Sequence, residues 1–435
     1  MALSLCTILC AISVASAQKV PAKDLLDQYK NHDPALEQSL RQTFTADALT
    51  KGAAAAGERG EFIWAVESAS QPQLQVGVTS HGVPYASAPQ LQVGNVATTM
   101  PPVPAVRVGG LWVYQGSLPT GTAYRYQWIA NGKVFGGAND VAVYGPNSYA
   151  QPGVPTGKVS DKLVIESHVY PGMTANVWYW TPAQYDGSTP LPVQIWGDGQ
   201  FYVEHPADYH VFEALDNLIA QKKIPPMVNV FIQPGMAGEK AMRSIEYDTV
   251  DDAYARYLLE EVLPEIEKHV KIRHDGYSRA MVGESSGGIC SFNAAFMKPD
   301  QFSRVLSWIG SFAALQRSPA EPVGGFVYPL RVRQEPKRNI RVWTQDGAED
   351  QENPRAGSWP LANIELANSL KMRLYDYHFS FGPGTHNQAQ GKAELPESLI
   401  WLWRDYDFSK TSQDFVQSPD EKDKPLWRVA AMNRN

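Results

Sequence analysis

A short stretch of small residues, GESSGG at 283–288, places two adjacent serines between glycines. Residues 283–287 fit the pattern Gly-x-Ser-x-Gly, in which the central serine is a nucleophile on a sharp turn between a strand and a helix. Ser285 holds that central position. The flanking sequence favours a strand at 280–282 and a helix at 289–296, which is the context that the pattern requires. We therefore predict that Ser285 is a nucleophile; the alternative is a chance match in a glycine-containing turn.

A serine nucleophile needs a histidine base, which follows the serine and the acid in the chain order typical of this motif. Of the 9 histidines, His378 and His386 lie near the end of the strand–helix region. His378 falls inside an alternating strand at 375–381, where a structural role is expected. His386 ends the loop FGPGTH at 381–386, which can bring an imidazole over the edge of a sheet. We predict His386 as the base, against the alternative of an ordinary exposed loop histidine.

The acid of such a triad is expected after the strand at 341–344. The following sequence, QDGAED, offers Asp346, Glu349 and Asp350. Any of the three can be a solvated loop charge, and only one is needed to orient the histidine. The residues alone do not choose among them.

An oxyanion hole is usually made of two backbone N–H groups beside the nucleophile. The N–H of Ser286, the residue after the nucleophile, is the first predicted donor. A second is expected from the loop GDGQF at 197–201, because glycines directly after a buried strand at 193–196 let the backbone approach closely. The alternative for this loop is a plain turn.

The elements that must position these groups lie between residues 159 and 410. Predicted strands alternate there with predicted helices, which indicates a mostly parallel sheet covered by helices on both faces. We expect strands at 177–180, 193–196, 227–232, 279–282, 304–309, 340–344 and 375–381, and helices at 209–221, 252–269, 287–297, 361–372 and 394–406.

The region before the sheet has a different texture of short strands and turns. Residues 57–150 predict a small all-β sandwich, with strands at 62–66, 111–114 and 123–129 and a hairpin turn at Asn131-Gly132. Three further segments complete the expected organisation: a lead segment of uncertain order at 18–56, a linker at 151–158 and a loosely held tail at 411–435.

Composition limits the class of protein. The chain has 435 residues, 43% of them hydrophobic and 19% charged, so a packed protein of more than one domain is expected. There are 38 Lys and Arg against 45 Asp and Glu, a net charge of −7, without a basic stripe. We therefore expect no nucleic-acid partner.

The N-terminus resembles a secretory signal. Residues 1–17, MALSLCTILCAISVASA, are apolar and end in a small-x-small cleavage pattern, although no Lys or Arg precedes the apolar run. The run is too short to span a membrane, and we expect a secreted or periplasmic protein without a membrane span after cleavage. Removal of this segment leaves Cys290 as the single cysteine, which we expect to be small and buried.

Several longer segments resemble the enterochelin-esterase-like and feruloyl-esterase-like (esterase D type) α/β-hydrolases. They are WGDGQFY (196–202), KKIPPMVNVFIQPG (222–235), MRSIEYDT (242–249), VGESSGGICSFNAAFMKPDQFSRVLSWIGSF (282–312), WTQDGAEDQENPRAGSWPLAN (343–363), FGPGTHN (381–387) and WLWRDY (401–406). The resemblance implies an α/β-hydrolase fold. More loosely, residues 57–150 resemble the early-set immunoglobulin-like sandwich that precedes such domains.

The resemblance also implies roles for individual residues. By the family's Gly-x-x-Asp pattern, Asp350 is the triad acid, although the adjacent Glu349 leaves this open. By its Asp-Gly-x pattern, Gln200 supplies the second oxyanion N–H. Three residues are implied to be substrate-binding: Arg243, Glu246 and Trp359.

These observations together predict a secreted serine carboxylic-ester hydrolase that needs no metal or organic cofactor. The expected substrates are feruloyl or acetyl esters of polysaccharide, and the first alternative is an enterochelin-type siderophore ester. An acyltransferase and a non-catalytic glycan-binding protein are the further alternatives. The sequence does not indicate the oligomeric state.

Overall fold

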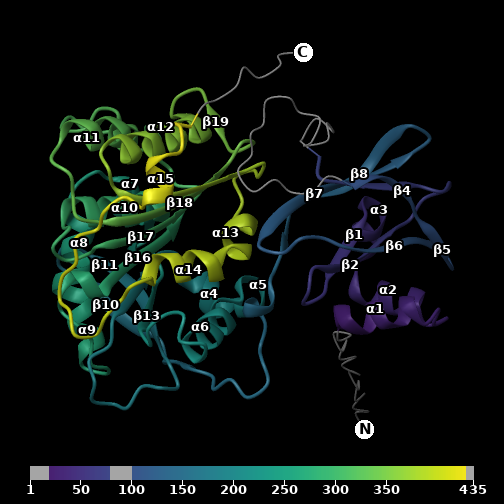
Figure 1. Ribbon diagram of the computed structural model, residues 1–435, viewed down its shortest axis with the longest axis horizontal. Coiled ribbons are helices and arrows are strands. Elements are labelled where there is room, and N and C mark those ends of the chain that lie inside the picture. The colour runs from purple at the N-terminus through teal and green to yellow at the C-terminus, as the bar shows by residue number, and fades with distance from the viewer. Residues whose placement is uncertain (1–18, 79–99, 428–435) are drawn as a thin grey trace, which may run out of the picture.

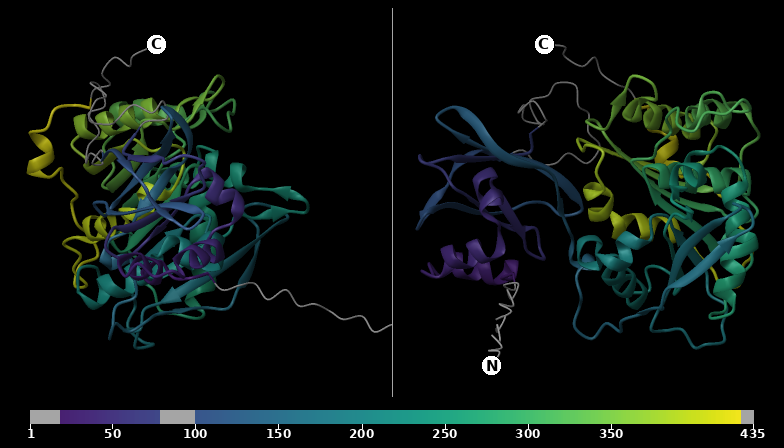
Figure 2. Two further views of the ribbon diagram at one scale, coloured as in Figure 1. Left: turned by 90° about the vertical axis from the view of Figure 1, so that its right-hand side faces the viewer. Right: turned by 180° about the vertical axis from the view of Figure 1, so that it is seen from behind.

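The computed structural model describes residues 19–78 and 100–427, and the predicted signal segment 1–17 lies outside these ranges. Two bodies stand side by side in Figure 1: a smaller one made of the N-terminal strands and helices, and a larger one built around a twisted sheet. The view from behind in Figure 2 shows the same arrangement of the two bodies. No helix of the described chain is long and apolar enough to cross a membrane.

Three short helices precede the first strand: α1 (Ala22–Lys30), α2 (Leu36–Thr43) and α3 (Ala46–Lys51). The buried faces of α1 and α2, with Leu25 and Leu40, pack against Ile63 in the neighbouring sheet. The alanine run that follows forms β1 (Ala53–Ala56), which pairs with β2 (Glu61–Val66). The lead segment 18–56 therefore forms regular structure from residue 22 onward, because the apolar faces of its helices pack against the sheet. The sheet itself begins at residue 53, before the expected boundary at residue 57.

The smaller body consists of two antiparallel sheets in the orders β1-β2-β6-β5 and β4-β3-β7-β8. The remaining bounds are β3 (Gln73–Val76), β4 (Met100–Pro104), β5 (Val106–Val108), β6 (Leu111–Ser117), β7 (Thr122–Ala130) and β8 (Lys133–Val143). Alternate residues of β7, Tyr124, Tyr126 and Trp128, meet Trp64 of the facing sheet in one core. The β7–β8 hairpin turns at Asn131 and Gly132, both at positive φ, as the sequence predicts.

The larger body contains a mixed sheet in the order β15-β14-β11-β13-β12-β16-β17-β18-β21, with β9 and β10 also paired to β11. Its six strands from β13 to β21 in this order run parallel. The bounds are β9 (Lys158–Val159), β10 (Leu163–Ser167), β11 (Met173–Thr181), β12 (Val193–Trp196), β13 (Val228–Ile232), β14 (Met236–Ala237), β15 (Lys240–Ala241), β16 (Arg279–Glu284), β17 (Arg304–Trp308), β18 (Arg341–Gly347) and β21 (Asp376–Gly382).

Helices cover both faces of this sheet, as expected for an α/β-hydrolase fold. In β16, Met281 points to one face, and its neighbours Ala280 and Val282 point to the other. The first face carries α7 (Arg243–Asp248), α8 (Ala253–Tyr257), a π-helical turn (Leu258–Val262), α9 (Leu263–Glu267), α10 (Ser286–Met297), α11 (Tyr328–Gln334) and α12 (Trp359–Met372). The second carries α4 (Gln200–Glu204), α5 (Pro206–Tyr209), α6 (Val211–Ala220) and α14 (Leu395–Trp403). Short elements complete the body: β19 (Glu352–Asn353), β20 (Gly357–Ser358), α13 (Ala389–Ala393) and α15 (Pro419–Lys422).

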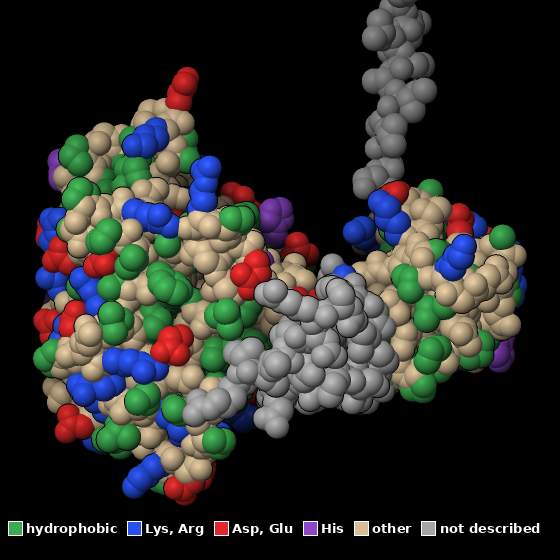
Figure 3. Space-filling model, turned by 90° about the horizontal axis from the view of Figure 1, so that it is seen from above, with side chains coloured by type: hydrophobic (Ala, Val, Ile, Leu, Met, Phe, Trp, Pro, Cys, Tyr) green, Lys and Arg blue, Asp and Glu red, His purple; other side chains and the backbone are tan. Residues whose placement is uncertain are grey.

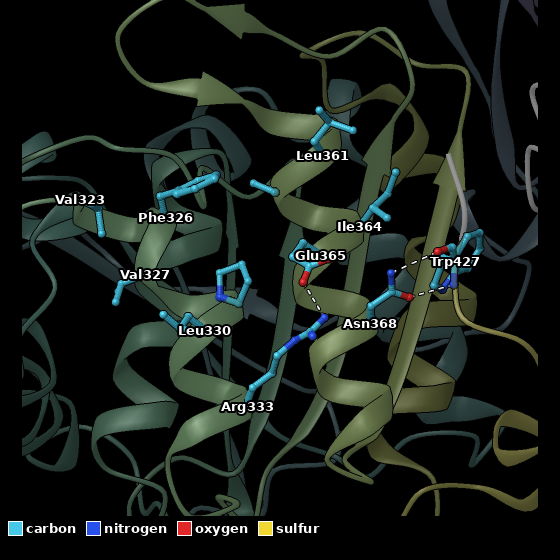
Figure 4. A pocket seen from close by; sticks show the side chains of 12 residues that line it. Val323, Phe326, Val327, Leu330, Arg333, Leu361, Ile364, Glu365, Asn368 and Trp427 are labelled. Atoms are coloured by element: carbon cyan, nitrogen blue, oxygen red, sulfur yellow. Dashed lines mark hydrogen bonds and ion pairs between the residues drawn. The ribbon is translucent and has the colours of Figure 1, made fainter. Parts of the chain in front are cut away.

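The described part of the tail, 411–427, is held against the larger body, which corrects the expectation of a loose tail. Phe415 is buried between the guanidinium groups of Arg304 and Arg341, at 5.2 and 4.8 Å from its ring centroid. Further along, Trp427 packs edge-on against Phe379. An apolar groove of about 760 Å³ lies between α11 and α12. Figure 4 shows Trp427 at one end of the residues that line it. Two aromatic residues, Phe415 and Trp427, therefore attach the otherwise polar tail to the larger body.

Charged side chains of both signs are interspersed on the face seen in Figure 3, without a broad basic patch on the described surface there. This view also shows the two bodies as separate lobes. On this face, the mixture of both signs agrees with the net charge of −7.

Candidate active site

Ser285 lies at the turn between β16 and α10, with φ 56° and ψ −120°. Non-glycine residues rarely adopt this conformation, which is typical of a strained functional turn. A Cβ atom on Gly283 would lie 2.2 Å from the carbonyl oxygen of Gly287, so the chain can turn this sharply only with glycine there. The N–H of Ser285 donates to the carbonyl of Trp308, and Ser311 N–H donates to the carbonyl of Ser285. The turn is thus fixed to the end of the neighbouring strand β17.

The structure brings Ser285, His386 and Asp350 together in a series. His386 Nε2 lies 2.8 Å from Ser285 Oγ, and His386 Nδ1 lies 2.6 Å from Asp350 Oδ1. The Asp350 side chain is fully buried, and the His386 side chain is 18% exposed. A buried carboxylate beside Nδ1 favours the tautomer with the proton on Nδ1, which leaves the Nε2 lone pair to accept the serine hydroxyl. This geometry can move a proton from Ser285 to His386.

The other candidates have different surroundings. Glu349 Oε2 accepts a hydrogen bond from Arg125 Nη1 at 3.0 Å. Asp346 is buried, and first burial and then the neighbouring Asp350 raise the pKa of its carboxyl well above the usual range. His378 stacks on a tryptophan ring in the sheet, and burial lowers its pKa to about 4. Among the candidates that the sequence left open, Asp350 is the one that meets His386.

The loops that carry the acid and the histidine leave adjacent parallel strands, β18 and β21, at the paired residues Gly347 and Gly382. Two backbone hydrogen bonds tie them together: Ala348 N–H to the Gly382 carbonyl at 2.8 Å, and Glu349 N–H to the Gly384 carbonyl at 3.0 Å. A Cβ atom on Gly347 would lie 2.1 Å from the Gly384 carbonyl oxygen. The two loops can therefore approach this closely only because a glycine stands at the end of β18.

The loop expected to supply the second oxyanion donor follows β12 at 197–199. Its Asp198 carboxylate accepts two hydrogen bonds from the Arg243 guanidinium, at 2.7 and 2.8 Å, and its N–H donates to Tyr247 Oη at 3.0 Å. Asp198 Oδ2 lies 3.4 Å from the position of a Cβ atom on Gly287, so the loop stands beside the first turn of α10. Gln200 begins α4 directly after it. Arg243 thus holds this loop, and with 37% of its side chain exposed its predicted contact with substrate stays a prediction.

Ser286 is the first residue of α10, and its buried hydroxyl donates to Asp248 Oδ2 at 3.2 Å. Glu246 is 1% exposed, and its carboxylate accepts the backbone N–H of Gly235 at 2.8 Å. Burial raises the pKa of Glu246 to about 7. A side chain in this position supports the loop at Gly235 and does not line a cleft, so the structure differs here from the expectation of a substrate-binding residue.

Trp359 is buried beside the candidate triad, with its ring edge-on to His386 at 6.0 Å between centroids. Its Nε1–H donates to Ser311 Oγ at 3.0 Å, and Ser311 Oγ lies 3.2 Å from Ser285 Oγ. Sequence reasoning missed Ser311. The available signal was its place in Gly-Ser-Phe, 310–312, two residues after the end of β17 at the same sheet edge as the nucleophile. Trp359 is therefore linked to Ser285 through the hydroxyl of Ser311.

A polar cleft of about 400 Å³ lies between the two bodies next to the histidine loop. We call it the interdomain cleft. Its lining includes Tyr144, the residue after β8, Phe201 and Tyr209 of α4–α5, and Asn387, the residue after His386. Lys392 also lines it and places its ammonium 3.6 Å from the centroid of the Tyr209 ring. The cleft therefore offers aromatic rings, the ammonium of Lys392 and the carboxylates of Asp140 and Asp208 next to the histidine loop.

Comparisons with known proteins give a family and two kinds of relative. The model of one family, described as "Putative esterase", matches residues 170–402. An iron(III) enterobactin esterase from Dickeya dadantii is 29% identical over 247 residues, which are 55% of this chain and 54% of that protein. An endo-1,4-β-xylanase/feruloyl esterase from Xylanibacter ruminicola is 32% identical over 88 residues, which are 20% of this chain and 12% of that protein. The chain thus spans about half the length of the first of these relatives and a much smaller share of the second.

A solved structure resembles this chain over most of its length. The ferric enterobactin esterase from Salmonella typhimurium superimposes with a TM-score of 0.51 at 17% identity, over 84% of this chain and 98% of that one. At this identity the likeness concerns the fold. It supports the α/β-hydrolase class of the larger body.

Proposed function

Because the chain belongs to this esterase family, we propose that it is a serine carboxylic-ester hydrolase in which Ser285, His386 and Asp350 form the catalytic triad. The observation that carries the proposal is the continuous series Asp350 Oδ1–His386 Nδ1 at 2.6 Å and His386 Nε2–Ser285 Oγ at 2.8 Å. Nucleophile, base and orienting acid in hydrogen-bond reach are the arrangement that acyl transfer to a serine requires.

In the first half-reaction, Ser285 Oγ attacks the ester carbonyl carbon while its proton passes to His386 Nε2. The buried Asp350 carboxylate stabilises the imidazolium that forms. The tetrahedral oxyanion is stabilised by the backbone N–H groups of Ser286 and Gln200. The imidazolium then protonates the leaving alcohol as the C–O bond breaks, and the acyl group remains on Ser285.

In the second half-reaction, His386 takes a proton from water, and the hydroxide attacks the acyl carbon. The second tetrahedral intermediate collapses to the free acid, and the proton on His386 returns to Ser285 Oγ. If an alcohol took the place of water, the acyl group would appear on that alcohol. A product assay with a sugar acceptor therefore separates hydrolysis from acyl transfer.

For the substrate we propose an ester that carries a phenolic aromatic group. The rings of Tyr144, Phe201 and Tyr209 along the interdomain cleft support an aromatic moiety, and Lys392 suits a phenolate or carboxylate there. Relatives named for feruloyl and for iron(III) enterobactin esters both fit this chemistry. Feruloyl esters of polysaccharide and catechol siderophore esters are therefore the two candidates, and a simple acetyl ester makes the least use of the cleft.

The test compares the wild type with Ser285→Ala on p-nitrophenyl acetate, methyl ferulate and the ferric complex of a tris-catecholate ester. Hydrolysis that disappears in the variant supports the triad, and the highest kcat/KM names the substrate branch. Equal rates in both proteins would refute Ser285 as nucleophile. A folded wild type that hydrolyses none of the three, yet binds polysaccharide, would favour the non-catalytic alternative.

We also propose that the protein is exported and cleaved before Gln18, on the basis of the apolar segment 1–17 and its Ala-Ser-Ala ending. N-terminal sequencing of the protein recovered from its natural host tests this. A mature chain that begins at Gln18 supports export, and one that retains residues 1–17 contradicts it.

A further inference from the structure

Two charged side chains of the smaller body reach the loops of the candidate triad. Asp140 of β8 accepts the backbone N–H of Thr385 at 3.3 Å and also accepts the Thr385 hydroxyl. Thr385 is the residue before His386. Because both polar hydrogens of Thr385 meet one carboxylate, the backbone just before the catalytic base is fixed in position and orientation.

The second contact reaches the acid in the same way. Arg125 of β7 donates from Nη1 to Glu349 Oε2 at 3.0 Å, and the two side chains are only 20% and 17% exposed. Glu349 is the residue before Asp350. An ion pair shielded from solvent to this degree is screened less by salt than one on the open surface.

A local irregularity in the hairpin brings these two side chains to the same place. The register of β7 and β8 shifts between the pairs Tyr124↔Val141 and Tyr126↔Ala138. One residue of β7, Arg125, therefore faces two residues of β8, one of which is Asp140, and this is a β-bulge. Asp140 has a φ of 50°. Bulges commonly redirect side chains beside functional sites, and aspartate tolerates the left-handed conformation better than most residues.

We propose that Arg125 and Asp140 are positioning residues, through which the β7–β8 hairpin holds Asp350 and His386 in line with Ser285. This inference rests on the proposed function and adds that the smaller body is part of the catalytic apparatus. The helix that follows the histidine, α13, also packs against β7 and β8. The hairpin therefore contacts the chain both before and after His386.

The physical reason lies in the sequence of the histidine loop. Gly382, Pro383 and Gly384 precede Thr385, and the carbonyls of Gly382 and Gly384 accept their backbone hydrogen bonds from the acid loop, which is itself a loop. Contacts with the hairpin tie both loops to a rigid sheet. A displacement of about 1 Å at a reacting group can cost about 100-fold in rate, so modest loosening should be measurable.

The variants separate a lost hydrogen bond from a lost fold. Thr385→Val removes the hydroxyl but keeps the shape, whereas Thr385→Ser keeps the hydroxyl. Asp140→Asn removes the charge while it preserves tolerance of the positive φ. Arg125→Gln removes the ion pair to Glu349. Lys51→Ala, which breaks an exposed ion pair of the smaller body, is the matched control.

The assay is hydrolysis of p-nitrophenyl acetate, whose small acyl group does not depend on the interdomain cleft, together with thermal unfolding of each protein. We expect Thr385→Val, Asp140→Asn and Arg125→Gln to lower kcat about 10-fold or more, with KM within about twofold and an unchanged unfolding temperature. Thr385→Ser should lose no more than about threefold, and the control should match the wild type.

Three results would overturn the inference while the wild type remains active: kcat within twofold of wild type in all three variants, equal losses for Thr385→Val and Thr385→Ser, or a loss confined to KM for large esters. The last would make Asp140 a substrate contact. A wild type that hydrolyses no ester, in contrast, would refute the proposed function itself.

Discussion

Glu284, the residue before the candidate nucleophile, provides a quantitative test of the electrostatics of this site. Its side chain is 3% exposed, and its Oε1 accepts a hydrogen bond from Gln388 Nε2 at 3.0 Å. Its Oε2 has no hydrogen-bond partner within the described structure. Burial, and then the nearby charge of Asp198, raises the pKa of Glu284 to about 7 from the ordinary value of 4.5.

The sign of the effect on stability follows from linkage. A carboxyl whose pKa is higher in the folded state binds its proton more tightly there, so it does not reduce the free energy of unfolding below about pH 4.5. As pH rises, the unfolded chain ionises first, and the folded state loses stability progressively until about pH 7, above which the loss is constant. A difference between 4.5 and about 7, at about 1.36 kcal/mol for each pKa unit, corresponds to about 3 kcal/mol.

Glu284→Gln removes this ionisation and keeps the shape and an acceptor for Gln388. We expect the variant to match the wild type at pH 4 and to exceed its free energy of unfolding by about 3 kcal/mol at pH 8. Urea unfolding at pH 4 to 8, with equal m-values, measures the difference. Glu239→Gln, at an exposed position, is the control and should show no trend with pH. A difference independent of pH, or a wild type that is the more stable protein at pH 8, would refute the reasoning.

Three further predictions concern the triad and the tail. Asp350→Asn should lower kcat by about 10⁴-fold with little change in KM, because the amide cannot hold His386 in the required tautomer, and steady-state kinetics on p-nitrophenyl acetate measure it; a loss below about tenfold would contradict this role. Asp346→Asn should retain most of the activity at pH 7, because burial and then Asp350 raise the pKa of the Asp346 carboxyl well above its usual range, which favours the neutral form that an amide resembles. A kcat as low as that of Asp350→Asn in the same assay would show that the charge of Asp346 is needed. Phe415→Ala should reduce the free energy of unfolding by about 3 kcal/mol in urea, whereas Val416→Ala, at an exposed position, should change it by less than about 0.5 kcal/mol; equal effects would show that the tail is not anchored at Phe415.

Parts of the fold that obey short-range rules could be predicted from the sequence. Alternating burial in β7, the turn at Asn131-Gly132 and the strand–turn–helix around Ser285 each depend on residues within a few positions of one another. The lead segment and the tail were predicted poorly for the opposite reason. Their apolar residues are few, and Leu25 or Phe415 becomes a core residue only against a surface formed by distant segments.

The sequence by itself determined that a serine on a glycine turn would be followed by an acidic loop and a histidine loop at one sheet edge. Tertiary structure decided which carboxylate meets His386, that Ser311 lies beside Ser285, and that Glu246 is an interior support. It also joined Asp140 to Thr385 and Arg125 to Glu349, pairs that are 245 and 224 positions apart. Such contacts leave no periodic pattern along the chain, because they depend on how the two bodies pack together.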